Sequence, residues 1–390
     1  MKRGVTATAI AIAASAIIGT PNLSQSKDGD ADDWCGSGHR DSKLTEFDAP
    51  DAAQTVSPIC GGGCGTIALA NNNGGTVIGV YTDENVVPHG FIRSCHGNVS
   101  SFDAPGAGLG AKLDQGTIPY SINDGGEIAG QYQDSTYIFH GFIRHRDGSF
   151  TNIDATDAGQ GAGQGTLAYS INHRGDTAGI YLDSSSNEHG FVRSRKGTLT
   201  EFDPNGSIAT MVCEETCLND DGSATGSFLD GNLLYHGFVR TRDGTVTPFD
   251  APEAGTGALV GTFAASITPN GEIAGYVVDD SNVAHGFVRH SDGTFEKAID
   301  VPKAFNGNGG GTVIYSINAS GTTTGVYSDS SLVNHGFSRS HDGHYRYFDA
   351  KDGGGGVYQG TRPSTNNDNT EVAGWYTDGG GLNHGFVWEP

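Results

Sequence analysis

The stretch Gly126–Ala155, which reads GEIAGQYQDSTYIFHGFIRHRDGSFTNIDA, is repeated with variations along most of the 390-residue chain. Its tripeptide His-Gly-Phe occurs seven times, at successive spacings of 51, 49, 47, 49, 50 and 49 residues. The histidines of these copies are His89, His140, His189, His236, His285, His335 and His384. So regular a period indicates a repeat architecture in which each repeat is one structural unit.

Each repeat divides into four short runs that are separated by turn signals. In the second repeat the runs cover 117–123, 127–133, 140–144 and 149–155, and Asp147-Gly148 is typical of a two-residue hairpin turn. No stretch shows a convincing helical period, so the fold class is all-β. Seven such units predict a seven-bladed β-propeller with four strands per blade.

A second motif, Phe-Asp-Ala and its variants, also has seven copies, but its first copy precedes the first His-Gly-Phe. The run Leu44–Ala49 is therefore a fourth strand without a blade of its own, and the last repeat, Thr361–Trp388, lacks a fourth strand. We expect Leu44–Ala49 to pair with His384–Trp388. This pairing of the N-terminal strand with the last blade would close the ring.

The N-terminus predicts export. Lys2 and Arg3 precede a small apolar run from Val5 to Gly19, which is the layout of a secretory signal peptide. We assign residues 1–26 to the signal peptide, with an uncleaved anchor as the alternative, 27–43 to an exposed leader and 44–390 to a single propeller domain. No other apolar run is long enough to span a membrane, so we expect a mature chain without a span that is secreted, periplasmic or at the cell surface.

The chain is strongly acidic, with a formal net charge of −23 that becomes −25 when Lys2 and Arg3 are removed with the signal. Such a surface repels nucleic acid and anionic lipid, and it suits cations, basic proteins or neutral glycans. The alternative is that the charge keeps an exported protein soluble. We therefore expect no nucleic-acid partner.

Six cysteines, an even number, favour disulfides in an exported chain. Cys60 and Cys64 are separated by three glycines and can bend towards each other, which leaves Cys35 to pair with Cys95. Cys213 and Cys217 can pair only if their strand bulges or turns, because four extended residues span about 13 Å and a disulfide needs less than about 7 Å. A zinc site made from two of these pairs is the alternative.

An aspartate ends the second run of every repeat, across a short loop from the histidine. These residues are Asp83, Asp134, Asp183, Asp230, Asp279, Asp329 and Asp378. We expect each aspartate to share a charge-assisted hydrogen bond with its histidine. Because every repeat has the pair, a structural role is predicted instead of seven acid/base or metal sites. By the same reasoning the repeated phenylalanine belongs to the core, and the arginine two residues after it pairs with the aspartate of the second motif.

The motifs H-G-F-[IV]-R, the D-G turn, F-D-A-P and S-I-N-x-x-G-x-x-x-G resemble those of the HAF-repeat family of extracellular bacterial proteins. The likeness extends from about Leu44 to Pro390. It implies export and a repeat fold. It brings no activity and no catalytic residue with it.

Function is expected where the repeats differ. The Gly-rich connections between repeats share one face of a propeller with the loops between second and third strands, and loops on a rigid scaffold are where ligands usually bind. A threonine near the start of the first strand is expected to ring the mouth of the central channel and to contact a ligand. These residues are Thr66, Thr117, Thr166, Thr262, Thr312 and Thr361.

The fourth repeat departs from this pattern, because Cys213-Glu214-Glu215-Thr216-Cys217 stands where the other repeats have the threonine. Glu214 or Glu215 would bind a cation or act as an acid or base near the channel mouth. The alternative is a local disulfide in a degenerate repeat.

We therefore predict an exported, monomeric binding scaffold that holds a glycan, a cell-surface component or a protein on the Gly-rich loop face. The alternative is a propeller enzyme, a hydrolase or lyase acting on an extracellular polymer, with its site at the channel mouth near the fourth blade. A purely structural surface protein is the third hypothesis. The sequence leaves catalysis open and predicts no cofactor, with a bound cation such as calcium as the alternative.

Overall fold

The computed structural model describes residues 42–57, 63–110, 115–213 and 216–390, and all regular secondary structure in these ranges is β-strand. Within them no helix exists that is long and apolar enough to cross a membrane. The prediction of an all-β chain is confirmed.

The strands follow the repeats. The first two repeats contain β2 (Gly65–Asn71), β3 (Val77–Thr82), β4 (Pro88–Arg93), β5 (Val99–Phe102), β6 (Gly116–Ile122), β7 (Ile128–Gln133), β8 (Phe139–Arg144) and β9 (Phe150–Ile153). The third and fourth contain β10 (Gly165–Ile171), β11 (Thr177–Leu182), β12 (Glu188–Arg193), β13 (Leu199–Phe202), β14 (Ser207–Val212), β15 (Ala224–Asp230), β16 (Tyr235–Arg240) and β17 (Val246–Phe249). The fifth and sixth contain β18 (Gly261–Ile267), β19 (Ile273–Val278), β20 (Ala284–Arg289), β21 (Gly311–Ile317), β22 (Thr323–Ser328), β23 (Asn334–Arg339) and β24 (Tyr345–Phe348). The last repeat contains β25 (Gly360–Asn366), β26 (Val372–Thr377) and β27 (Asn383–Glu389), and β1 (Lys43–Phe47) lies at the start of the chain.

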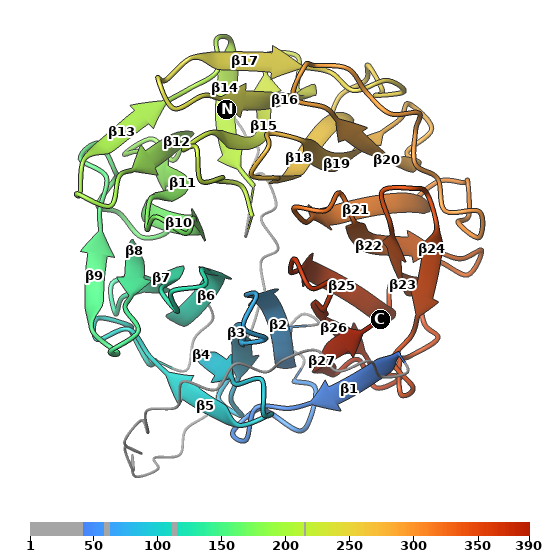
Figure 1. Ribbon diagram of the computed structural model, residues 1–390. Helices are drawn as coiled ribbons and strands as arrows, with labels where there is room; N and C mark the ends of the chain where they lie inside the picture. Colours follow the sequence, from blue (N-terminus) through green and yellow to red (C-terminus); the bar gives the residue numbers. More distant parts are fainter. Residues whose placement is uncertain (1–41, 58–62, 111–114, 214–215) are drawn as a thin grey trace, which may run out of the picture.

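Consecutive strands of a repeat pair antiparallel and form one blade, and the blades are arranged around a central axis as in a β-propeller (Figure 1). The first strands, such as β6 and β21, lie nearest the axis, and the fourth strands, such as β9 and β24, lie at the rim. In the fifth repeat the fourth strand is reduced to the isolated bridges Gly286↔Ile299 and Arg289↔Phe295. The reason is one additional residue, because His285 lies 15 residues before its aspartate whereas the other described pairs within a repeat are 14 apart.

The core lies between neighbouring blades. One apolar cluster joins Ile143 and Ile153 of the second repeat to Tyr181 and Phe191 of the third. The phenylalanines of the seven His-Gly-Phe motifs are at most 3% exposed, as predicted. Because a single sheet has no apolar partner of its own, each blade depends on its neighbours for burial.

A side-chain amide links each blade to the next beside the axis. The asparagine after the first strand, for example Asn123, accepts backbone N–H groups of its own turn and donates its Nδ2 to the carbonyl oxygen of the equivalent residue in the following repeat. Six such bonds of 2.8 to 3.2 Å connect Asn72 to Asn123, Asn123 to Asn172, Asn172 to Asn219, Asn219 to Thr268, Asn318 to Asn367 and Asn367 to Asn72. Thr268 breaks the series because a threonine has no amide to donate.

The predicted pairing of the first strand with the last repeat is present. β1 lies antiparallel to β27 with Leu44 opposite Trp388 and Phe47 opposite Gly385 (Figure 1). Phe47 also makes an edge contact with Phe91 of the first repeat, at 5.8 Å between ring centroids. β1 therefore fills the position of a fourth strand in the last blade and contacts the first blade as well.

A chain that begins after Pro50 should lose this strand. We expect its free energy of unfolding to fall by about 3 kcal/mol, the lower end of the range for removal of a large aromatic side chain, because the partly buried Phe47 leaves with the strand. Thermal unfolding followed by circular dichroism measures the change. Addition of a peptide of residues 42–50 should restore part of the lost melting temperature, and an unchanged melting temperature without the peptide contradicts the assignment.

Thr268→Asn should complete the series of amide links. The new amide can donate to the backbone of Asn318, and we expect stability to rise by about 0.5–1.5 kcal/mol. Thr268→Ala is the control and should be destabilising, since the Thr268 hydroxyl accepts the N–H of Glu272 at 3.0 Å. A Thr268→Asn variant no more stable than the parent in urea unfolding would show that the series contributes nothing.

Candidate functional site

The predicted threonine ring at the channel mouth is wrong. Thr66, Thr117, Thr166, Thr262, Thr312 and Thr361 are at most 1% exposed. Each hydroxyl accepts, at 2.9 to 3.0 Å, the backbone N–H of the residue after the aspartate of the second motif, as Thr166 does from Ala155. These threonines therefore fasten the end of a fourth strand to the start of the next first strand, and no ligand can reach them.

The fourth repeat keeps this threonine, contrary to the prediction. Thr210 lies opposite Phe228, as Thr166 lies opposite Tyr181 in the third repeat, and its hydroxyl donates to Asp203. Cys213 and Cys217 come after it and form a disulfide, with 5.4 Å between the Cα atoms. Cys213 follows Val212 at the position where the other first strands carry a β-bulge, for example between Ala168 and Ser170.

The remaining predictions for this region fall outside the described residues. Glu214 and Glu215 lie there, as do Cys35 and Cys60. Cys64 and Cys95 both take part in disulfides, and the pairings of Cys60 with Cys64 and of Cys35 with Cys95 stay predictions.

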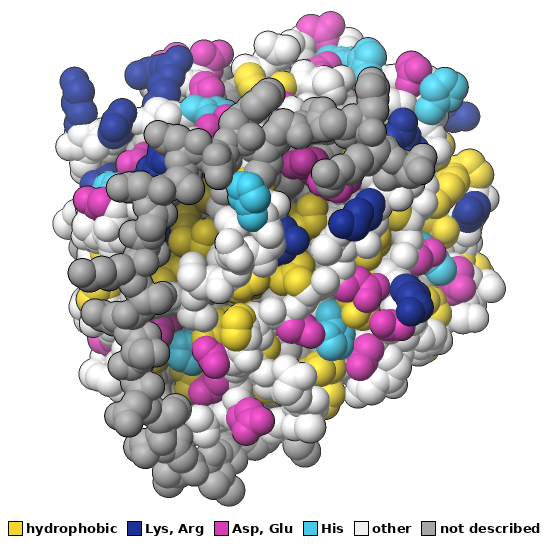
Figure 2. Space-filling model, turned by 60° about the horizontal axis from the view of Figure 1, so that its bottom comes forward, with side chains coloured by type: hydrophobic (Ala, Val, Ile, Leu, Met, Phe, Trp, Pro, Cys, Tyr) yellow, Lys and Arg dark blue, Asp and Glu magenta, His cyan; other side chains and the backbone are white. Residues whose placement is uncertain are grey.

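Each repeated histidine bridges two aspartates. Its Nδ1 lies 2.7 to 3.1 Å from the aspartate of the second motif: Asp103, Asp154, Asp203, Asp250, Asp300, Asp349 and, for His384, Asp48. Its Nε2 lies only 3.6 to 3.9 Å from the aspartate that ends the second strand, the partner expected from the sequence. The second-strand aspartate instead caps its loop, as Asp134 does by accepting the N–H groups of Thr136 and Ile138. Figure 2 shows several histidines beside acidic side chains on the surface.

The predicted pairing of arginine with the aspartate of the second motif is wrong. The histidine occupies that aspartate, and the arginine lies over an aromatic ring of the preceding blade. Arg144, for example, lies 5.0 Å from the ring centroid of Phe102. The repeated polar residues thus hold blades together and leave no site common to all of them.

One cluster could in principle hold a cation. Glu253, His285 and Asp300 place one ligand atom each within 4.8 Å of one another. His285 Nδ1 is already 2.8 Å from Asp300, however, so the cluster is also the fifth copy of the structural pair with one acid added.

The end of the channel beside the asparagine links is lined by polar side chains around a cavity of about 130 Å³. His173 bridges Asp124 and Asp220 there, at 3.0 Å from each. The hydrogen bond that His173 donates to Asp124 favours the protonated imidazole more than burial opposes it, and Asp220 adds to this effect. Together the two aspartates raise the pKa of His173 to about 9. Asn73 bonds to Asp124 and Asp368 in the same way. These groups bind one another across blades.

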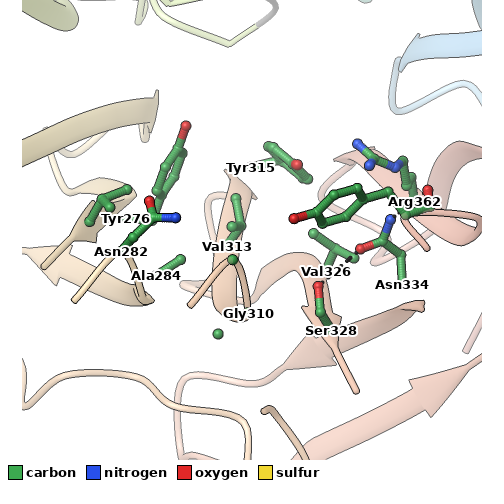
Figure 3. Close-up of a pocket in the computed structure, with 14 residues that line it drawn as sticks. Tyr276, Asn282, Ala284, Gly310, Val313, Tyr315, Val326, Ser328, Asn334 and Arg362 are labelled. Atoms are coloured by element: carbon green, nitrogen blue, oxygen red, sulfur yellow. Dashed lines mark hydrogen bonds between the residues drawn. The ribbon is translucent and has the colours of Figure 1, made fainter. Parts of the chain in front are cut away.

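A larger cavity, of about 210 Å³, lies beside the start of β21 on the Gly-rich loop face (Figure 3). It is lined by Tyr276, Val278, Asn282, Ala284, Gly309, Gly310, Gly311, Val313, Tyr315, Val326, Ser328, Asn334, Tyr358 and Arg362. Figure 3 shows Tyr276 and Asn282 on one side, Val313 and Tyr315 in the middle, and Arg362 and Asn334 on the other. The cavity is therefore built by the fifth, sixth and seventh repeats and by the connections between them.

The cavity exists because two side chains are small. Between the fourth and fifth repeats, Tyr235 packs against Phe263 with the rings tilted and 4.6 Å between their centroids, and the two rings fill the space between blades. The equivalent residues one repeat later are Ala284 and Val313, since Ala284 pairs with Gly311 as Tyr235 pairs with Gly261. Exchange of two aromatic rings for an alanine and a valine leaves a hollow.

Three phenols point polar groups at this hollow. Burial and the neighbouring Tyr315 and Tyr235 raise the pKa of Tyr276, so its hydroxyl stays protonated at neutral pH and can donate a hydrogen bond. Tyr315 occupies the bulge of β21, between Ile314 and Ser316, where a bulge turns a side chain out of the regular alternation. Tyr358 is 48% exposed and covers the hollow from the connection after the sixth repeat.

The backbone of Tyr358 is held firmly. Its N–H donates to the carbonyl of Leu332 at 2.7 Å, and its carbonyl accepts Nδ2 of Asn334 at 2.9 Å. Asn334 is in turn held by the hydroxyl of Ser328. A Cβ atom on Gly309 would lie 2.8 Å from the Tyr358 hydroxyl, so that glycine makes room for the ring.

The comparisons with known proteins concern the fold alone. No family model matches the chain, and no curated protein sequence matches it. Among solved structures, the BP39L lectin from Burkholderia pseudomallei is 9% identical with a TM-score of 0.52, over 81% of this chain and 94% of that one. A puromycin hydrolase mutant in complex with PGG is 13% identical with a TM-score of 0.51, over 80% of this chain but 50% of that one. This chain therefore spans about half the length of the hydrolase.

The sequence predicted the Gly-rich loop face as the candidate binding face, but it did not predict the cavity beside β21. The Gly-rich connections do lie beside the second-to-third-strand loops, as the bond from Gly309 to the carbonyl of Asn282 illustrates. The signal that could have found the cavity is a comparison of the third residue of each first strand. From the first repeat to the seventh, that residue is Ile67, Ile118, Leu167, Met211, Phe263, Val313 and Arg362.

The repeated histidines should make stability depend on pH. Burial opposes protonation of His89, but its hydrogen bond to Asp103 and the nearby charges of Asp103 and Asp83 outweigh burial and raise the pKa to about 9 from an ordinary value of 6.5. The stabilisation is complete below pH 6.5 and is lost as the pH rises through 9. We expect the melting temperature to fall over that interval, with a shallower slope in His89→Gln. His344→Gln changes a side chain that is 84% exposed and should leave the slope unchanged; equal slopes in all three proteins would contradict the bridging role.

Proposed function

We propose that this protein is an exported, seven-bladed β-propeller that binds a glycan in the cavity beside β21. The cavity carries the proposal. Its three phenols, two amides and one guanidinium group combine flat apolar surface with hydrogen-bond donors and acceptors, and such a lining suits a sugar ring with its hydroxyl groups. A volume of about 210 Å³ has room for one pyranose unit of a longer chain.

The lining also favours binding over catalysis. None of the described residues around the cavity is a carboxylic acid, a histidine or a cysteine, the commonest acids, bases and nucleophiles in enzymes, and the hydroxyl groups of its tyrosines and of Ser328 serve in these roles less often. The large apolar side chains that are exposed lie on the same connections or at their ends: Val56, Leu109, Ile208, Leu259, Phe305, Val357 and Tyr358. Apolar surface is thus exposed on the connections that build the Gly-rich loop face.

Other observations support the rest of the proposal. The amide link from Asn367 to Asn72 joins the last repeat to the first, as a closed ring of seven blades requires. The disulfide between Cys213 and Cys217 fits an oxidising compartment outside the cytoplasm. The repeat motifs resemble those of the HAF-repeat family, and that resemblance implies export.

Filling the cavity should abolish binding without harming the fold. Val313→Phe copies the phenylalanine that the fifth repeat has at this position, and we expect glycan affinity to fall by about 30-fold or more while the melting temperature stays within about 2 °C. A glycan array identifies the ligand, and titration calorimetry measures the affinity. Ile118→Phe makes the same exchange in the second repeat, far from the cavity, and should keep the affinity of the parent.

Two outcomes would contradict the proposal. One is a Val313→Phe protein that is folded and binds as tightly as the parent. The other is a parent protein that binds no glycan on the array but cleaves one of its polymers, since that result favours the enzyme hypothesis.

A further inference from the structure

We propose that the ligand of this cavity is an acidic glycan, and that the guanidinium group of Arg362 pairs with a carboxylate of a uronic acid unit. This inference rests on the proposed function and adds the chemical class of the ligand.

Arg362 is out of place in the repeat pattern. The third residue of the first strand is apolar in the other six repeats. In β25 this residue is an arginine opposite Trp375, and its guanidinium lies 5.2 Å from the centroid of the Trp375 ring. A charged side chain in an otherwise apolar position costs stability unless it serves another purpose.

In the described part of the chain, Arg362 has no acidic partner. Among the described residues no carboxylate lies within ion-pair distance of it, and its buried Nε has no hydrogen-bond partner. Arg339 offers a contrast, because it pairs with Glu296 at 3.1 Å. The side chain of Arg362 lines the cavity and extends towards Tyr315 in the view of Figure 3.

The surroundings are unusual for this chain. The sequence has 45 acidic residues and 22 lysines and arginines, yet the cavity is lined by one arginine and no acid. A site without local acids gives an anion little near repulsion on a protein of this charge. A carboxylate accepts two parallel bonds from a guanidinium, which a neutral sugar cannot do.

The other polar groups suit the remainder of a sugar ring. Asn282 presents an amide from the opposite side of the cavity and is tied to Asn308 at 2.8 Å. The rings of Tyr276 and Tyr315 offer apolar faces and hydroxyl groups. A uronic acid bound with its carboxylate at Arg362 would thus place its hydroxyl groups among phenols and amides.

The test uses the full protein and matched pairs of polymers: oligogalacturonate, alginate and hyaluronan, each with a form in which the carboxyl groups are reduced to alcohols. Affinities are measured by titration calorimetry for the parent, Arg362→Gln, Arg362→Lys and Arg346→Gln. Arg346 is an exposed arginine of β24 outside the cavity, so its substitution makes the same change in net charge. Thermal unfolding verifies that each variant is folded.

We expect the parent to prefer at least one acidic polymer over its reduced form by about 10- to 100-fold, the value of a charged hydrogen-bonded pair, because the pairing requires the carboxylate. Arg362→Gln should remove this preference, Arg362→Lys should keep part of it, and Arg346→Gln should keep all of it. Equal affinity for acidic and reduced forms in the parent overturns the inference, as does a preference that survives in folded Arg362→Gln.

The two levels of the proposal fail differently. If Val313→Phe abolishes binding while Arg362→Gln changes nothing, the cavity binds a neutral glycan and only the acidic class is wrong. If neither substitution affects glycan binding, the cavity is not the site and both proposals fall.

Discussion

The side-chain amide that follows the first strand in six of the seven repeats is the contact on which the arrangement of blades depends. The same asparagine closes its own turn through Oδ1 and reaches the next blade through Nδ2, so local and tertiary structure are satisfied by one residue. A buried amide left without partners would be costly, and the register between neighbouring blades is thereby constrained. A propeller needs such links because the innermost strands have no strand beyond them to pair with.

Away from the axis, other repeated residues perform the same task. The histidine joins the third strand to the aspartate after the fourth, the arginine lies on a ring of the preceding blade, and the threonine holds the backbone of the next connection. Each has a partner in nearly every repeat. A residue that occurs in every blade is thus committed to assembly, and a ligand site must come from positions where the blades differ.

The cavity beside β21 arises from such differences. Loss of two aromatic rings at Ala284 and Val313 creates the space, a bulge turns Tyr315 towards it, and Arg362 supplies a charge at the third position of the next first strand. None of these changes disturbs the links between blades. The scaffold and the site therefore vary independently, as loops and pockets do on other repeat folds.

The period of His-Gly-Phe, the turn residues and the displaced first copy of Phe-Asp-Ala were sufficient to predict all-β blades and the pairing of β1 with β27. These features are local or periodic, and the backbone obeys them in every repeat. The partners of the polar side chains were decided by tertiary structure, because each partner lies across a blade or in the neighbouring one. That is why Thr166 became a buried acceptor, why Arg240 lies on Phe202 and not on Asp250, and why Thr210 and not Cys213 continues the threonine series. The cavity was also decided by tertiary structure. Whether Ala284 and Val313 leave a hollow depends on the distance between two packed blades, and only the assembled molecule defines that distance.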